Sequence, residues 1–106
     1  MAVLELRTYT VKPGRMAEWL EIFDKDIIPL NDAFGIKILA SWRNVDKQDE
    51  FIWLRTFEDA AAQKSKSEAM YSSQQWKAME EQVEDCLDQE KWEVKNLSPT
   101  AFSPLQ

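Results

Sequence analysis

The side chains best suited to chemistry lie close together near the start of the sequence, in the segment ELRTYT. A carboxylate, a guanidinium and a phenol occupy every second position there, as Glu5, Arg7 and Tyr9. This spacing places all three on one face if the segment is a β-strand. A guanidinium can hold an oxyanion, and a carboxylate or a phenol can move a proton. The three residues are therefore candidate catalytic residues.

A second group of candidates lies in FIWLRTFED, where Trp53 and Arg55 share a face. Together with Trp42 from the preceding segment, they could bind a flat, apolar substrate that carries an anionic or carbonyl group. Arg55 is also a catalytic candidate, as an alternative to Arg7 for holding an oxyanion. The side of the sheet on which Trp42 lies stays open, because a change of one residue in strand register reverses the faces.

Each candidate also has a purely structural interpretation. Glu5 could form an ion pair with Arg7 and Arg55 between neighbouring strands, and the aromatic residues could be core or interface anchors. One acid and two arginines leave a positive charge unpaired, which favours an anion or a further acid nearby. The residues alone do not decide between these interpretations.

The composition excludes several kinds of site. The chain has no histidine and a single cysteine, Cys86, so we expect no cofactor, no metal site and no intrachain disulfide. A net charge of −6, from 13 basic and 19 acidic residues, argues against a nucleic-acid partner. The sequence has no apolar run of about 18 residues and no secretory or transit-type start, so we expect no membrane partner and a cytoplasmic location.

Alternating patterns predict four strands, which cover residues 3–11, 36–43, 51–57 and 92–97. Helical patterns separate the first strand from the second and the third from the fourth, and a short charged loop joins the second to the third. Two helical crossovers around a hairpin indicate a ferredoxin-like βαββαβ fold. We therefore expect a single α+β domain over residues 1–106, with a four-stranded antiparallel sheet.

The helical regions have recognisable starts and interruptions. An apolar stripe begins at Met16 and is interrupted at Pro29, where the helix should kink or end. Asp59 is the expected N-cap of the second region. Ser72 or Ser73 should begin the third, and Ser72 fits a capping box there. The acidic run in this last helix is expected to face solvent.

The helices can cover only one face of the sheet. We expect that face to be the aliphatic one, formed by Leu4, Leu6, Ile52 and Leu54. The opposite face would then carry the candidate site residues among aromatic rings, and it is too apolar to stay in water. A second copy of the chain would cover it, so the expected partner is the chain itself. A pocket between the helices and the inner sheet face of this homodimeric barrel could bind a hydrophobic or anionic small molecule.

Four segments resemble a known family. The segments ELRTYTVKPGRMAEWLEIF, FIWLRTFED, YSSQQWKAM and LSPTAFSPLQ are similar to the opening motif, third strand, late helix and C-terminal tail of the NIPSNAP family. Together they cover nearly the whole chain. The family belongs to the dimeric α+β barrel superfamily, so the resemblance implies the same homodimeric barrel.

The superfamily resemblance also implies a class of activity, which is the cofactor-free oxygenation, isomerisation or cyclisation of a hydrophobic carbonyl compound. In such chemistry Arg7 or Arg55 would hold the oxyanion, and Tyr9 or Glu5 would move the proton. Two alternatives stay open. The protein could be a non-catalytic ligand-binding or interaction module, or a purely structural homodimer with a fully packed inner face.

Overall fold

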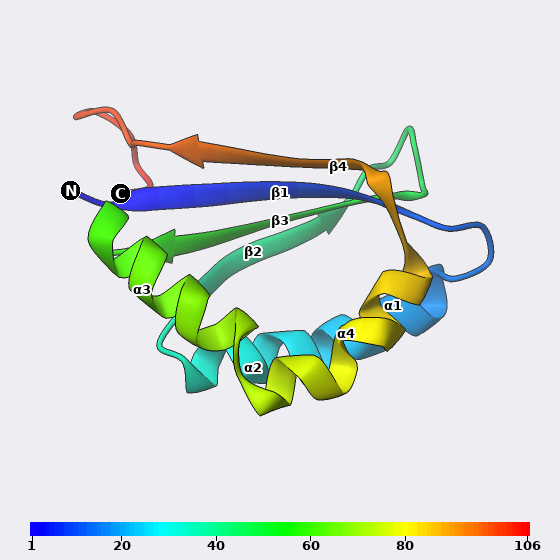
Figure 1. Ribbon diagram of the computed structural model, residues 1–106. Coiled ribbons are helices and arrows are strands. Elements are labelled where there is room, and N and C mark those ends of the chain that lie inside the picture. Colours follow the sequence, from blue (N-terminus) through cyan, green and yellow to red (C-terminus); the bar gives the residue numbers. More distant parts are fainter.

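A computed structural model describes residues 1–106 and contains the predicted order of elements (Figure 1). The strands are β1 (Val3–Val11), β2 (Lys37–Arg43), β3 (Glu50–Phe57) and β4 (Leu87–Leu97). They form one antiparallel sheet in the order β2-β3-β1-β4, with β1 and β3 in the centre. The predicted single-domain, ferredoxin-like α+β fold is therefore confirmed.

All the helices pack on one side of this sheet (Figure 1). The crossover after β1 contains α1 (Met16–Ile22), a π-helical turn η1 (Phe23–Ile27) and α2 (Ile28–Ala33). The crossover after β3 contains α3 (Ala60–Tyr71) and α4 (Gln74–Cys86). None of these helices combines the length and the apolar character that crossing a membrane requires.

The interruption predicted at Pro29 is a π-helical turn rather than a break. Proline has no N–H to donate, and its ring would clash with a carbonyl one turn earlier in a regular helix. The chain widens just before this point, where the N–H of Ile28 donates to the carbonyl of Phe23, five residues back. The helical path therefore continues past Pro29 and carries Asn31 into the interior, where it is buried.

Both predicted helix starts in the second crossover are confirmed, the second of them at Ser73, which was one of the two expected positions. Asp59 caps α3, as predicted. The cap of α4 is Ser73, whose hydroxyl accepts a hydrogen bond from the N–H of Trp76. The capping box at Ser72 is wrong, because the Ser72 hydroxyl donates to the Glu68 carbonyl at the end of α3. The last strand begins directly after α4 and therefore earlier than predicted.

The expectation for the two sheet faces is wrong, because the helices cover the aromatic face. Tyr9, Phe51 and Trp53 belong to the main buried cluster, together with Trp19 and Phe23 from the first crossover. The Phe23 ring meets Phe51 and Trp53 in edge-to-face pairs, with centroids 4.8 and 5.3 Å apart. Such pairs are favourable beyond the area they bury, so the aromatic stripe of the helix selects the aromatic face of the sheet.

The aliphatic residues consequently lie on the uncovered face of the sheet. This open face contains Leu4, Leu6, Trp42, Ile52 and Leu54. Trp42 pairs with Ile52 across β2 and β3, which places both side chains on the same side. The Trp42 side chain is 49% exposed. The sheet therefore separates Trp42 from Trp53 and Arg55, with which it was expected to bind a substrate.

Candidate functional site

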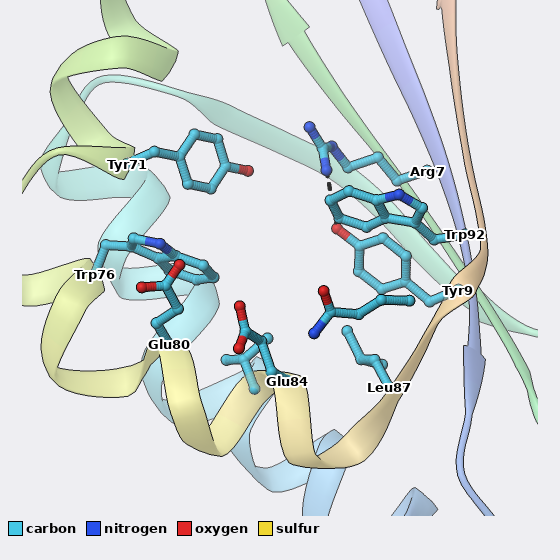
Figure 2. A pocket seen from close by; sticks show the side chains of 10 residues that line it. Arg7, Tyr9, Tyr71, Trp76, Glu80, Glu84, Leu87 and Trp92 are labelled. Carbon is cyan, nitrogen blue, oxygen red and sulfur yellow. Dashed lines mark hydrogen bonds between the residues drawn. The ribbon is translucent and has the colours of Figure 1, made fainter.

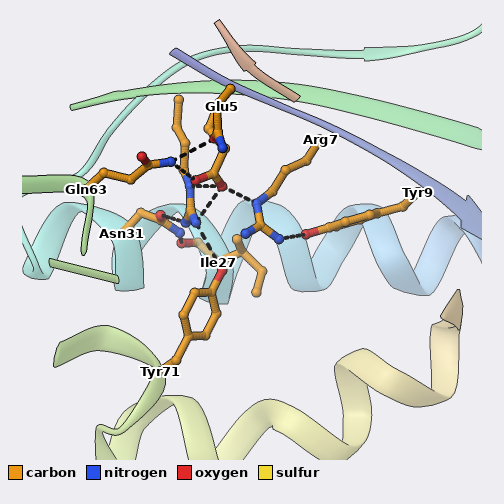
Figure 3. Close-up of polar contacts among 9 residues, drawn as sticks. Glu5, Arg7, Tyr9, Ile27, Asn31, Gln63 and Tyr71 are labelled. Carbon is orange, nitrogen blue, oxygen red and sulfur yellow. Dashed lines mark hydrogen bonds and ion pairs between the residues drawn. The ribbon is translucent and has the colours of Figure 1, made fainter. Parts of the chain in front are cut away.

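The four catalytic candidates lie on the helix-covered face and form one hydrogen-bonded cluster, of which Figure 3 labels Glu5, Arg7 and Tyr9. Glu5 pairs with Arg55 across β1 and β3, and the Nε of Arg55 donates to the Oε1 of Glu5 at 3.0 Å. The same carboxylate oxygen accepts a short hydrogen bond from the Nε of Arg7. Arg7 also donates from its Nη1 to the hydroxyl of Tyr9 at 3.1 Å. The structure thus brings Glu5, Arg7, Tyr9 and Arg55 together.

Arg55 is the enclosed centre of this cluster, with an exposed fraction of 0%. Its Nη1 donates to the Oδ1 of Asn31 at 2.9 Å, and its Nη2 donates to the hydroxyl of Tyr71 at 3.2 Å. The amide of Asn31 in turn donates to the carbonyl of Ile27 in η1. Each nitrogen of the Arg55 guanidinium therefore donates within the chain, and the side chain is fully buried, so Arg55 organises the cluster and is not accessible to a ligand.

Glu5 serves as the counter-ion of the two arginines. Its second oxygen accepts a hydrogen bond from the Nε2 of Gln63 in α3, at 2.9 Å. Burial by itself would raise the pKa of Glu5, but the charges of Arg7 and Arg55 outweigh burial and hold the pKa below its usual value. Glu5 is therefore ionised at neutral pH and poorly suited to accept a proton. The cluster of one acid and two arginines keeps a net positive charge.

A pocket of about 330 Å³ opens between α4 and the sheet, beside the cluster (Figure 2). Arg7 and Tyr9 of β1 and Trp92 of β4 line it from the sheet side. Trp92 stacks on Tyr9 with ring centroids 5.6 Å apart, and the guanidinium of Arg7 lies 5.6 Å from the Trp92 ring. The remaining lining residues are Tyr71, Trp76, Glu80, Val83, Glu84, Leu87 and Gln89.

Arg7 is the cation that this pocket offers to a ligand. Its Nε and Nη1 are bonded to Glu5 and Tyr9, whereas its Nη2 has no hydrogen-bond partner in the chain. This Nη2 is also accessible from outside the protein. The side-chain nitrogen and oxygen atoms that are both enclosed and without a hydrogen-bond partner belong to Trp19 and Trp53, and the Nη2 of Arg7 is not among them. Burial would lower the pKa of Arg7, but the neighbouring tyrosines and Glu5 raise it, so the guanidinium stays charged. Burial raises the pKa of Tyr9, which keeps the phenol protonated at neutral pH.

The pocket contains only some of the residues expected from the sequence. Arg7 and Tyr9 line it, whereas Glu5 and Arg55 lie behind Arg7 in the buried cluster. The three residues expected to bind substrate, Trp42, Trp53 and Arg55, are absent from its lining. Trp53 is a core residue, and Trp42 lies on the open face.

Sequence reasoning missed the contribution of α4 and β4 to the pocket. Glu80 and Glu84 belong to the acidic face that was expected in solvent; Glu84 is exposed and Glu80 is half-buried, and both also line the pocket with Trp76. These three residues follow one another at intervals of four, which places them on one side of a helix. That spacing, together with the aromatic residue at its start, was the available indication of a pocket wall.

The remaining groups with reactive or metal-binding potential are not gathered into a site. No three His, Cys, Asp or Glu side chains lie close enough together to hold a metal ion. Cys86 is fully buried in the main core cluster. Burial and the neighbouring Glu18 raise the pKa of its thiol, so Cys86 stays protonated.

Comparison of whole structures places the fold among several solved proteins. A NIPSNAP family protein from Agrobacterium tumefaciens superposes with a TM-score of 0.91 and 20% identity, covering 100% of both chains. An uncharacterised NIPSNAP domain protein from Burkholderia xenovorans gives a TM-score of 0.86 and 21% identity, covering 96% of this chain and 98% of that one. A Bacteroides thetaiotaomicron protein, provisionally named an antibiotic biosynthesis monooxygenase, gives a TM-score of 0.67 and 17% identity, covering 99% of this chain and 93% of that one.

Comparison of sequences supplies the family. No curated protein matches the chain. The NIPSNAP family model, however, matches residues 4–104, and this range includes β1 with Arg7 and Tyr9, α4 with Glu80, and β4 with Trp92. Because that match spans nearly the whole sequence, the chain belongs to the NIPSNAP family.

Proposed function

We propose that the pocket binds a hydrophobic compound with a carbonyl or carboxylate group and converts it by proton transfer without a cofactor. The observation that carries this proposal is the unpaired Nη2 of a charged arginine in a pocket with aromatic walls. The volume of about 330 Å³ lies in the range of small-molecule sites, which begins at roughly 300 Å³. Apolar walls with a few fixed polar groups are typical of such sites.

The position of Arg7 suits the stabilisation of an oxyanion. Glu5 and Tyr9 hold two of its nitrogens, so the guanidinium is already oriented before a ligand enters. A fixed donor in a site that excludes water stabilises developing charge more strongly than a mobile donor does. The aromatic rings of Trp92, Tyr71 and Trp76 provide flat surfaces on which a ring system can stack.

The acids of α4 supply a proton acceptor that Glu5 cannot provide. Figure 2 shows Glu80 and Glu84 on the helix side of the pocket, across from Arg7 and Tyr9. In the proposed step, Glu80 removes a proton from the carbon next to the carbonyl. The C–H electron pair forms a carbon–carbon double bond, and the π pair of the carbonyl moves onto its oxygen. Arg7 holds the resulting enolate, and the proton returns to the same or another carbon. Return of the proton to another carbon completes an isomerisation. Cyclisation would instead have the enolate carbon attack an electrophilic carbon of the same substrate, and oxygenation would also consume dioxygen.

We further propose that the partner of the chain is a second copy, which covers the open face of the sheet. On this face Leu4 and Leu54 are buried, Leu6 and Ile52 are half-buried, and Trp42 at the edge is half-exposed; an exposed aromatic side chain beside apolar neighbours is typical of an interface. The proposed dimer keeps the expected sheet-to-sheet contact but uses the aliphatic face instead of the aromatic one. The pocket then lies within each protomer, because the sheet separates it from the partner.

Arg7→Gln should weaken the binding of 2-naphthoate, an aromatic carboxylate, by about 10- to 100-fold. A hydrogen bond to a charged group contributes about 1.5–3 kcal/mol, and the substitution removes the charge. Glu5 keeps Arg55 as its partner, so the fold should survive. Isothermal titration calorimetry on the wild type, the variant and the exposed control Arg43→Gln measures the effect. Equal affinity of the wild type and Arg7→Gln for 2-naphthoate would contradict the role of Arg7.

Proton transfer can be measured with a neutral probe, 2-acetylnaphthalene, in D₂O. We expect the wild type to exchange the acetyl protons for deuterium faster than buffer does, as followed by proton NMR. Glu80→Gln should reduce this acceleration by about 10²- to 10⁴-fold, the usual contribution of a general base. Glu81→Gln is the matched control, because Glu81 is exposed on the same helix and does not line the pocket. Binding of the probe without accelerated exchange would indicate a non-catalytic binding protein.

A further inference from the structure

A second, smaller cavity lies deeper in the molecule, next to the pocket. Its volume is about 20 Å³. Four of its lining residues, Tyr9, Tyr71, Trp76 and Val83, also line the pocket. The others are Trp19, Ile27, Leu30, Asn31, Trp53 and Met70. A cavity needs about 10–15 Å³ to hold one water molecule, so this inner chamber has room for a single molecule of that size.

The residues that line the inner chamber include the two tryptophans whose indole nitrogens lack a hydrogen-bond partner. Among all enclosed side-chain nitrogen and oxygen atoms, only the Nε1 atoms of Trp19 and Trp53 lack a partner. Both residues line the chamber, and their exposed fractions are 1% and 2%. A buried donor without a partner is costly because it has lost its hydrogen bonds to water, and buried tryptophans usually find an acceptor. Two such donors on residues that line one chamber are the reason to look for an acceptor there.

The chamber lining also contains oxygen atoms that can accept a further hydrogen bond. The hydroxyl of Tyr9 accepts one from Arg7, and the hydroxyl of Tyr71 accepts one from Arg55. The Oδ1 of Asn31 likewise accepts one from Arg55. A hydroxyl or amide oxygen has two acceptor sites, so each of these groups retains capacity. A molecule with both donors and acceptors would therefore find partners of both kinds.

We propose that the inner chamber is a binding site for one water molecule. The water accepts hydrogen bonds from the indole N–H groups of Trp19 and Trp53 and donates its own protons to oxygen atoms of the lining. Buried waters with two to four polar partners are a regular part of globular structures. The site joins the aromatic core to the arginine cluster, and it exists whether or not the neighbouring pocket is catalytic.

A high-resolution crystal structure of the wild-type protein tests this site directly. We expect one peak of solvent density in the chamber, about 2.9 Å from the indole nitrogens. An empty chamber, in which each N–H points at the face of a neighbouring ring, would overturn the proposal. Such ring contacts are available to Trp19, which lies edge-on to Tyr9 and Phe51.

A solution measurement keeps the proposal testable without crystals. In ¹⁵N-labelled wild-type protein, we expect cross-relaxation between a long-lived water and the indole protons of Trp19 and Trp53. The half-exposed indoles of Trp42 and Trp92 are internal controls, because they contact bulk water and should show only short-lived contacts. Trp19→Phe and Trp53→Phe assign the two signals. Absence of the long-lived water signal from both buried indoles would overturn the proposal.

Discussion

Arg55→Ala is expected to lower the free energy of unfolding by about 3–5 kcal/mol, a large part of the stability of a small domain. The substitution leaves Asn31 and Tyr71 without their donor in the interior. It also leaves Glu5 with only one of its two arginines, and it opens a cavity where the guanidinium lay. Removal of one member of a buried ionic network is costly because the remaining polar groups cannot regain water.

Urea titration followed by circular dichroism measures this loss. Arg55→Lys keeps the charge but cannot reproduce the three-way contact of the guanidinium, so it should also be clearly destabilised. The control is Lys25→Ala, which removes the exposed Lys25–Glu21 pair and should change stability by less than about 1 kcal/mol. A loss from Arg55→Ala no larger than that of the control would show that the cluster does not support the fold.

Trp42→Ala should weaken the proposed homodimer by roughly 30- to 1,000-fold, since a tryptophan anchor at an interface typically contributes about 2–4 kcal/mol. Trp92→Ala is a matched control. The two tryptophans have the same exposed fraction, 49%, but Trp42 lies on the open face and Trp92 lines the pocket. Trp92→Ala should leave the dimer intact and reduce the binding of 2-naphthoate. Trp42→Ala should weaken the dimer and leave the binding of 2-naphthoate unchanged.

Sedimentation equilibrium over a range of protein concentrations measures the first effect, and calorimetry measures the second. A wild-type protein that remains monomeric at every concentration would refute the proposed dimer. Equal weakening of the dimer by both substitutions would refute the assignment of the open face, because only one of the two side chains can reach a partner there.

The fold could be predicted from the sequence because the patterns that specify its strands and helices each lie within a short segment. The alternation in β1 and β3, the helical stripe from Met16 and the cap at Asp59 each depend on a few neighbouring residues. Which face of the sheet the helices cover is not specified by such a local pattern. Both faces of the central strands are apolar enough to be buried, so the outcome depends on which face fits Trp19 and Phe23 of the first crossover.

The site could be predicted only in part for a related reason. Charged residues at alternate positions usually indicate a face in water, but here Glu5, Arg7 and Arg55 are buried. Their burial depends on Asn31 and Gln63, which lie on separate helices far along the chain. No short pattern in the sequence connects these residues, whereas Arg7 and Tyr9 could be found because two-residue spacing is a property of the strand itself.

The π-helical turn at residues 23–27 has a consequence for how this chain tolerates deletions. This widened turn holds one residue more than a regular α-helical turn does, because its hydrogen bond spans five residues instead of four. Loss of one residue within it would therefore restore a regular helix and leave Asn31 facing Arg55, since the tighter turn makes up for the rotation of the missing residue. Loss of one residue from the regular helix α1 would instead rotate Asn31 away from Arg55 by about 100°, the rotation per residue of an α-helix. The turn is therefore the part of this crossover in which a deletion disturbs the buried cluster least.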